Sequence, residues 1–241
     1  MNDELIRKHE GHVTRLTLNR PHKANALSAS LVEALLNAVE YAESDGTRLL
    51  ILDGAGDHFS AGFDFTAYLD QSDGDLALRF IRIETLLQQL YHAPFETLVL
   101  AHGKIFGAGA DLVACCGVRI ASPGTTFRMP GLRFGVVLGT RRLSHRIGPD
   151  KAREMLSASR AFDADEALKL NFVTHLAAPQ AWPALINAIR ASCELLSPAT
   201  AAALHRQTAT DSRAEDMAAL ARSISAPGLK ERIRLFRDAA K

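Results

Sequence analysis

The stretch that decides the fold is His102–Asp111, HGKIFGAGAD. It lies between an apolar run at Leu98–Ala101 and a helical pattern at Leu112–Cys116, which predicts a turn between a buried strand and a helix. Its three glycines would let another group approach the backbone closely. The first amides of a helix have no partner inside that helix and carry a partial positive charge. The stretch is therefore a candidate site for an anion, or for an oxygen that becomes negative during a reaction.

The composition predicts one large domain, or one domain with a small appendage. The 241 residues are 47% hydrophobic, and 28 basic against 27 acidic residues give a net charge of +1, which provides no electrostatic case for nucleic acid or an anionic membrane. Cys115 and Cys116 lie in an apolar helical run, so we expect buried thiols in a reducing compartment. The N-terminal MNDELIRKHE has no apolar signal core. We expect a soluble cytoplasmic protein with no nucleic-acid or membrane partner.

Strand and helix patterns alternate along the first half of the chain. Strands are expected at 13–19, 48–53 and 97–101, with helices at 31–44 and 76–91 between them. This order is typical of βαβ units with parallel pairing and right-handed crossovers. Short strands at 118–121 and 126–129 are expected to extend the same sheet. The second half is mostly helical, apart from a short strand at 172–176. Capping boxes are predicted at Ser30 with Glu33 and at Asp163 with Glu166. The fold class is α/β.

A second glycine-rich loop follows another strand of the same expected sheet. Phe59–Asp64 and Phe106–Asp111 each follow an apolar strand, and adjacent parallel strands bring such turns to one edge, where ligands of open α/β sheets bind. Two amides that converge from two loops on one oxygen form an oxyanion hole. The residues alone leave a second interpretation open, in which the two turns only connect elements.

Several other functional motifs are absent from the sequence. No G-x-G-x-x-G follows the first strand, and there is no Walker sequence and no G-x-S-x-G motif. The nine histidines show no ligand spacing of a known metal site. We therefore expect no metal and no dinucleotide cofactor.

The sequence resembles the crotonase family, the enoyl-CoA hydratase/isomerase superfamily, over nearly the whole chain. No single motif is diagnostic, and the resemblance depends on the order and spacing of several segments together. These segments are 16–21 (LTLNRP), 25–27 (NAL), 59–64 (FSAGFD), 103–111 (GKIFGAGAD), 127–130 (FRMP), 135–142 (GVVLGTRR), 147–148 (IG) and 161–173 (AFDADEALKLNFV).

The resemblance implies a spiral of ββα turns that forms a core over residues 1–195, followed by a C-terminal helical trimerisation region over 196–241. It also implies a homotrimer, or trimers paired into a hexamer. Members of the family bind acyl-CoA thioesters and hold the thioester oxygen with two backbone amides. By position, those amides belong to Ala61 and Ala108. Many relatives have glycine at the second position, so the hole requires a backbone φ there that suits alanine.

The resemblance also implies a binding region for coenzyme A, which is part of the substrate and not a separate cofactor. The segment that lines the CoA side contains Lys23, Ala24 and Ala26, and Lys23 is either a partner for a phosphate or a solvated surface lysine. Residues Ala61, Phe63 and Asp64 are expected on the adenine and pantetheine side.

The number of acidic residues at the predicted site limits which reactions are possible. Hydratases of this family use two glutamates, at the positions of Asp111 and Gly131, and this chain keeps an acid only at the first. Hydration needs one group to activate water and another to protonate carbon, whereas a double-bond shift needs only one. Isomerisation therefore fits better, while hydration, decarboxylation, thioester hydrolysis and acyl-CoA binding without catalysis stay open. Asp111 itself either transfers protons or only caps its helix, and a cap would have a lowered pKa.

Nearby polar side chains could assist the single acid. An arginine would suit an acyl group that bears a carboxylate, and a histidine could titrate near neutrality. Surface placement is nevertheless the expectation for each of the candidates, which are His58, Arg128, Arg133, Arg141, Arg142 and His145. Arg141 and Arg142 are adjacent, so they cannot face the same way on a helix.

Overall fold

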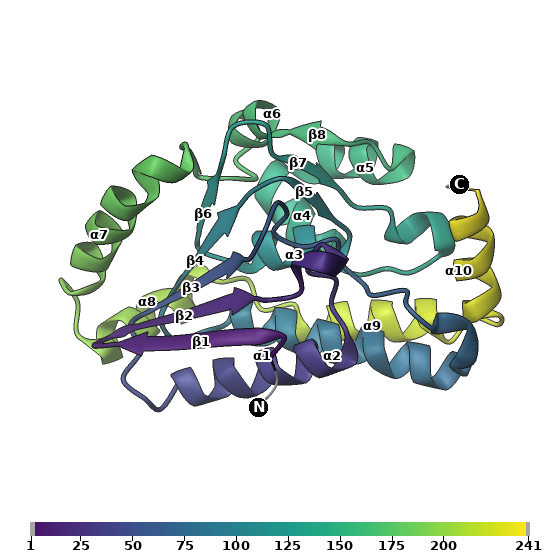
Figure 1. Ribbon diagram of the computed structural model, residues 1–241, viewed down its shortest axis with the longest axis horizontal. Helices are drawn as coiled ribbons and strands as arrows, with labels where there is room; N and C mark the ends of the chain where they lie inside the picture. Colours follow the sequence, from purple (N-terminus) through teal and green to yellow (C-terminus); the bar gives the residue numbers. More distant parts are fainter. Residues whose placement is uncertain (1–2, 240–241) are drawn as a thin grey trace.

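The computed structural model describes residues 3–239 and contains two β-sheets with helices around them (Figure 1). The main sheet has six strands in the order β1-β2-β3-β4-β6-β9. β1 and β2 are antiparallel, and every other neighbouring pair is parallel, so the predicted parallel α/β arrangement is confirmed. The strands are Leu5–Glu10, Val13–Leu18, Leu49–Gly54, Glu96–Ala101, Val118–Ala121 and His175–Leu176.

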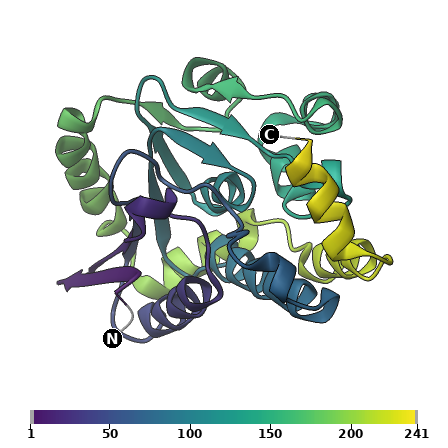
Figure 2. The ribbon, with the colours of Figure 1, turned by 45° about the vertical axis from the view of Figure 1, so that its right-hand side comes forward.

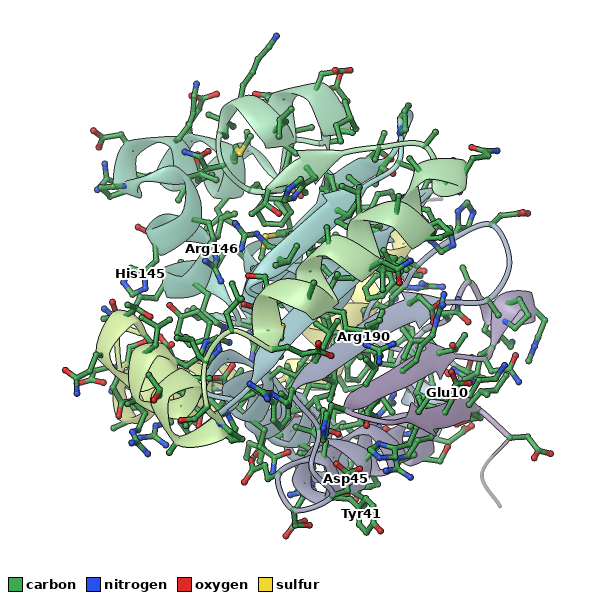
Figure 3. All side chains as sticks on the ribbon, turned by 90° about the vertical axis from the view of Figure 1, so that its left-hand side faces the viewer. Glu10, Tyr41, Asp45, His145, Arg146 and Arg190 are labelled. Carbon is green, nitrogen blue, oxygen red and sulfur yellow. The ribbon has the colours of Figure 1, made fainter. Side chains whose placement is uncertain are left out.

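Both faces of the main sheet are covered, which explains why its central strands are continuously apolar. On one face, Leu49, Ile51 and Leu98 pack against α7 (Trp182–Cys193), the helix that crosses in front of the sheet and carries Arg190 in Figure 3. Helices α1 (Ala29–Ala42) and α2 (Asp73–Tyr91) cover the other face. Each such leucine or isoleucine contributes about 1.5–3 kcal/mol relative to an exposed position.

A second sheet of three strands changes two of the sequence predictions. It contains β5 (Lys104–Phe106), β7 (Thr126–Arg128) and β8 (Phe162–Asp163). The prediction that 126–129 extends the main sheet is wrong, because the turn at Ser122–Thr125 takes the chain out of that sheet and β7 pairs with β5. The stretch 102–111 is also more than a turn, since it contains β5 and the beginning of α3 (Ala108–Cys115).

The helix starts confirm one predicted cap and correct the other. Ser28, not Ser30, caps α1, and its Oγ accepts a hydrogen bond from the Leu31 amide at 3.0 Å. The Ser30 hydroxyl instead donates to Glu4 in the N-terminal segment, a long-range contact that local sequence does not reveal. Asp163 caps α6 (Ala164–Lys169) as predicted, through the Glu166 amide at 2.8 Å, but the Glu166 carboxylate accepts from Arg160 and does not complete the predicted capping box.

The rest of the chain is mainly helical. A 3-10 turn, η3 (Gly131–Phe134), leads to α4 (Thr140–Ile147) and α5 (Pro149–Ala158). Three further short 3-10 turns are η1 (Pro21–Lys23), η2 (Tyr68–Asp70) and η4 (Pro179–Ala181). The C-terminal helices are α8 (Pro198–Thr208), α9 (Arg213–Ile224) and α10 (Leu229–Asp238). Within residues 3–239, no helix combines the length and apolarity that crossing a membrane requires.

The last two helices pack on the core of the same chain. α9 and α10 both contact α2, and α10 also contacts η3, an arrangement visible in Figure 2. Leu220 and Ile224 of α9 and Leu229 and Ile233 of α10 are buried members of the main hydrophobic core. This part of the C-terminal region therefore belongs to the body of the domain.

Candidate active site

Two glycine-rich loops meet directly, as the sequence predicts. The Phe106 amide donates to the Ser60 carbonyl oxygen at 3.1 Å. A Cβ on Gly62 would lie 2.3 Å from the Phe106 oxygen, and one on Gly109 would lie 2.4 Å from the Ser60 oxygen. Any larger residue at either position would push the loops apart. Both glycines are therefore required by the close approach of two backbones.

One of the two expected oxyanion amides is already occupied. The Ala61 amide donates to the Ala24 carbonyl oxygen at 2.8 Å, so Ala61 as the donor to a thioester oxygen is wrong. The amide of Phe63, two residues after Ala61, is available instead. The Leu27 amide donates to the Gly62 carbonyl oxygen, and the Leu27 carbonyl oxygen accepts from the Asp64 amide. The Phe63 amide between them has no acceptor among residues 3–239. Sequence analysis missed Phe63 as a donor, because the register of the loop depends on its pairing with Leu27.

The Ala108 amide is also available. Ala108 is the first residue of α3, and its amide has no acceptor in the described part of the chain. Gly107 takes up the strained backbone at this helix start, with φ at +50°, whereas Ala108 has no positive φ, so alanine suits the position. A Cβ on Gly62 would lie 2.9 Å from the Ala108 nitrogen, which places the peptide preceding Phe63 beside this amide.

A cavity lies in front of these loops. Ala61, Phe63, Ala108 and Asp111 all line it. Most of the remaining wall is aromatic or aliphatic: Phe65, Phe80, Phe106, Gly107, Met129, Pro130, Gly131, Leu132, Phe134, Val136, Leu138, Thr140, Leu156 and Phe236. Among the described residues that form this wall, Asp111 has the only titratable side chain. Gly131, where the resemblance to the crotonase family implies a second acid in hydratases, also lies on the wall.

Asp111 is buried in an apolar setting. Its side chain is on α3, the residue is 2% exposed, and within residues 3–239 its Oδ1 atom has no hydrogen-bond partner. Burial raises the pKa of this carboxyl from its usual 3.8 to about 8, since removal from water penalises the charged form. The guanidinium of Arg142 opposes the rise, and the charge of Glu84 adds to it. The lowered pKa expected for a helix cap is therefore wrong here.

A buried ion pair lies behind Asp111. Arg142 of α4 donates to Glu84 of α2 through two hydrogen bonds, one of them 3.0 Å long, and both side chains are at most 3% exposed. Arg142 also lies 3.3 Å from Asp216. Surface placement of Arg142 is therefore wrong, and its charge is taken up by carboxylates other than Asp111. Arg141, whose side chain is 46% exposed, pairs with the other oxygen of the same Asp216 carboxylate at 3.0 Å, so the two adjacent arginines differ in burial but converge on one carboxylate.

Gly139 is a site residue that sequence analysis missed. Its φ is +65°, and a Cβ built on it would lie only 1.4 Å from Asp111 Oδ1. The absence of a side chain at Gly139 thus makes room for the carboxyl group. The available signal was a glycine in place of the usual Ser, Thr, Asp or Asn immediately before a helix.

The residues expected to bind CoA lie beside the cavity and do not form its wall, apart from Ala61 and Phe63. Lys23 is exposed at the end of η1, and the Ala24 carbonyl accepts from Ala61 as described above. The Ala26 carbonyl accepts from Arg20. Asp64 forms an ion pair with Arg20 at 2.8 Å. Burial alone would raise the pKa of Asp64, but hydrogen bonds from Thr66 and Arg20 hold it below its usual value.

The other polar candidates are engaged elsewhere or point outward. Arg128 Nε donates to the Ser159 carbonyl at 2.9 Å, and His58 Nδ1 accepts from the Lys104 amide at 3.2 Å. Arg133 is exposed. His145 lies at the outer edge of α4 in Figure 3, the view turned away from α10. None of these four lines the cavity.

The fold and the two facing glycine-rich loops are those of enzymes of the crotonase class. The family model for enoyl-CoA hydratase/isomerase matches residues 8–232, and the chain belongs to this family. It is 32% identical over 194 residues to the probable enoyl-CoA hydratase echA6 of Mycobacterium leprae, with 76% of each chain covered. It is 29% identical to the crotonyl-CoA hydratase of Syntrophomonas wolfei, over 74% of this chain and 70% of that protein.

A solved structure is similar over nearly the full length. A Bordetella parapertussis protein of the enoyl-CoA hydratase/isomerase group superimposes with a TM-score of 0.96 and 52% identity, covering 97% of this chain and 98% of the other. An enoyl-CoA hydratase from Bacillus halodurans, at 20% identity, shares the fold with a TM-score of 0.85.

Proposed function

We propose that this enzyme shifts the double bond of an enoyl-CoA thioester, with Asp111 as the group that moves the proton. One observation carries the proposal. Asp111 is the only titratable side chain on the cavity wall among the described residues. A double-bond shift needs one group that takes a proton from one carbon and returns it to another, so a single carboxyl is sufficient.

The thioester oxygen would accept hydrogen bonds from the Phe63 and Ala108 amides. Both amides lack an acceptor within residues 3–239, both residues line the cavity, and the two loops are in direct contact. Preorganised donors in a site that excludes water stabilise a developing oxyanion by about 2.7–4 kcal/mol each. This pair of donors supports chemistry that passes through an enolate.

The reaction would then proceed in two proton transfers. The Asp111 carboxylate takes a proton from C2 of a 3-enoyl thioester, and the electron pair of the C–H bond delocalises onto the thioester oxygen as an enolate. The resulting carboxylic acid gives its proton to C4, so the double bond moves to C2–C3 and the carboxylate is regenerated. The raised pKa of Asp111 makes its charged form a stronger base than an ordinary carboxylate.

Hydration of a 2-enoyl-CoA is the second candidate, and it is favoured by the similarity to proteins named enoyl-CoA or crotonyl-CoA hydratase. Its difficulty is the glycine at position 131, which leaves no second acid on the wall. Decarboxylation of a charged acyl group and thioester hydrolysis gain no support from this cavity, where no basic side chain is present among the described lining residues.

A substrate panel tests the proposal. The purified enzyme is incubated with 3-enoyl-, 2-enoyl-, 3-hydroxyacyl- and malonyl-CoA esters, beside the variant Asp111→Asn. We expect conversion of the 3-enoyl ester to the conjugated 2-enoyl ester, read by the absorbance of the conjugated thioester, and its loss in Asp111→Asn. Faster hydration than isomerisation would overturn the proposal in favour of a hydratase. Equal isomerisation by the variant would remove Asp111 from the mechanism, and binding without turnover would indicate a binding protein.

A second acid can be added to test the same reasoning in reverse. A Cβ on Gly131 would meet only the Val136 carbonyl oxygen, at 3.1 Å, so a side chain needs a small local adjustment. We expect Gly131→Glu to raise hydration relative to isomerisation, while Gly131→Gln, which has the same size but no acid, does not. An equal effect of both substitutions would contradict the role given to the missing acid.

Three further features are part of the proposal. The assembly is a homotrimer or hexamer, the protein acts in the cytoplasm, and Lys23 faces a phosphate of CoA. They are supported by the family and by the sequence. Lys23 is exposed, and its neighbour Ala24 accepts the hydrogen bond from the Ala61 amide. Comparison of CoA affinity between wild type and Lys23→Ala tests the last of them.

A further inference from the structure

The far end of the cavity is closed by the C-terminal helix of the same chain. Phe236 of α10 lines the cavity that Asp111 and Ala108 also line. Its ring lies 5.0 Å from that of Phe134, which in turn lies 6.4 Å from Phe80, and Phe80 stacks on Phe63 at 4.4 Å. A continuous series of rings therefore runs from the amide of Phe63 to the last helix.

The position of α10 is fixed by several bonds. The carboxylate of Asp73 on α2 accepts from the Leu229 and Lys230 amides, at 3.1 and 2.9 Å, and so caps the N-terminus of α10. Arg232 donates to the carbonyl oxygens of Phe134 and Gly135, at 2.9 and 3.1 Å. These contacts join α10 to α2 and η3, the elements that form the neighbouring wall, so Phe236 is held in place.

The space between these walls is small and mostly apolar. The cavity has a volume of about 70 Å³, roughly half that of a cavity of about 150 Å³ that accommodates benzene. Among the described residues of the wall, no side chain carries a positive charge, and only Asp111 and Thr140 are polar. This combination favours a short hydrocarbon chain over a long one, an aromatic ring or a carboxylate.

We propose that Phe236 limits the length of the acyl chain, and that the substrates are short, uncharged acyl-CoA thioesters. The inference builds on the proposed function, because it takes the cavity to be the acyl site. A longer chain would have to displace the Phe236 ring or α10, at the expense of ring contacts and of the Asp73 and Arg232 bonds. Truncation of Phe236 would open the wall where the chain needs room.

Binding measurements test this without requiring turnover. Dissociation constants are measured for the saturated esters butanoyl-, octanoyl- and decanoyl-CoA with wild type, Phe236→Ala and Phe236→Trp. We expect wild type to prefer butanoyl-CoA, and Phe236→Ala to change the decanoyl-to-butanoyl affinity ratio by about tenfold or more in favour of decanoyl. Phe236→Trp should weaken octanoyl binding further. Leu235→Ala is the matched control, since Leu235 is its neighbour on α10 and is 56% exposed.

The outcomes separate the two proposals. If wild type binds decanoyl-CoA as tightly as butanoyl-CoA, or if Phe236→Ala leaves the ratio unchanged, the length limit is overturned even when isomerisation is observed. If isomerisation is absent but the ratio shifts as expected, the proposed reaction fails and the length limit stands. Phe236→Trp retains a large ring, so it tests the limit even if Phe236→Ala loosens α10, which circular dichroism and thermal melting would detect.

Discussion

A single buried carboxyl determines how this site responds to pH. Asp111 is surrounded by apolar residues of the cavity and by an Arg142 whose charge is paired with Glu84 and Asp216. Its pKa of about 8 means that the acid form predominates at neutral pH. The site therefore holds a base that is strong but mostly protonated until the solution becomes mildly alkaline.

The expected pH profile of the proposed isomerisation follows from this. Because abstraction of the C2 proton needs the charged form, kcat/KM should rise with pH and level off above about 8, the folded pKa of Asp111. Initial rates from pH 6 to 9.5 measure it, with the melting temperature at each pH as a control for unfolding. A rate that instead falls through this range would show that the acid form is the active one.

The buried Asp111 carboxyl should also lower the free energy of unfolding of the enzyme. Its folded pKa lies above the unfolded value of 3.8, so the unfolded state is favoured as pH rises from about 4 to about 8, and the penalty is constant above that. Asp111→Asn removes this penalty, and we expect it to raise the free energy of unfolding at pH 8 by roughly 1–3 kcal/mol. Urea denaturation at pH 4 and pH 8 measures the effect, and a gain of the same size at pH 4 would contradict this origin.

A third prediction at the scale of one residue concerns Gly139. Gly139→Ala places a methyl group where Asp111 Oδ1 now lies and forces alanine into a positive φ. We expect a loss of at least about 1 kcal/mol in stability and a fall in kcat of about 100-fold as the carboxyl is displaced. Gly148→Ala, at another positive φ with open space around it, is the control for backbone strain alone. Equal losses of kcat in both variants would argue against displacement of Asp111.

At the scale of elements, the first turn of α3 supplies one proposed oxyanion donor, and helix chemistry offers a way to remove it. Proline is tolerated at the first position of a helix because its missing N–H has no intrahelical partner there. Ala108 occupies that position after Gly107. A substitution can therefore delete the amide hydrogen and leave the helix in place.

We expect Ala108→Pro to lower kcat by about 100- to 1,000-fold, the effect of losing one oxyanion donor. Ala108→Gly retains the N–H and should keep kcat within a few-fold of wild type. Steady-state kinetics with a 3-enoyl-CoA ester measure both, and melting temperatures check the fold. A normal kcat in a folded Ala108→Pro protein would exclude this amide from the reaction.

How far the sequence could predict each element depends on whether its signal is local. The apolar strands β3 and β4 and the helices α1 and α2 follow from periodicity within a few residues, and the glycines of the two loops indicate their close approach. The choice of Phe63 over Ala61 as an available amide depends on pairing with Leu27 and Ala24, more than thirty residues away. The departure of β7 into a second sheet, and the cap at Ser28, likewise depend on partners distant in sequence.

The pKa of Asp111 and the burial of Arg142 also depend on residues that are distant in the sequence. Near Asp111 the sequence shows only a helix start, which favours a lowered pKa. The opposite result arises because α2, α4 and the cavity phenylalanines, which come from five separate segments, surround it. Sequence patterns identify the residue, but only the assembled surroundings determine its protonation.

At the scale of the whole molecule, the C-terminal region has apolar side chains both in the core and on the surface. Leu220, Ile224, Leu229 and Ile233 are buried in the core of the chain, while Leu204 of α8 and Leu195 just before it are at least half exposed. Exposed apolar side chains of this kind are candidates for contact with further copies. The trimer expected from the family would use this region.

The assembly can be measured directly. We expect light scattering after size-exclusion chromatography to give three or six times the 26.1 kDa mass of one chain. Leu204→Glu should reduce the mass if that helix face is in the interface, whereas Lys8→Glu on the exposed strand β1 should not. A mass of 26.1 kDa at micromolar concentration for wild type would contradict the trimer.

The position of α10 at the end of the cavity has a consequence for the synthesis and folding of the enzyme. Residues of the wall are spread from position 61 to position 236, so a ribosome must release the chain through Phe236 before the proposed acyl site has its last wall. A nascent chain could form the sheet and its covering helices earlier, yet it would hold no closed site. For the proposed acyl site, selection by chain length is therefore expected only once Phe236 has left the ribosome.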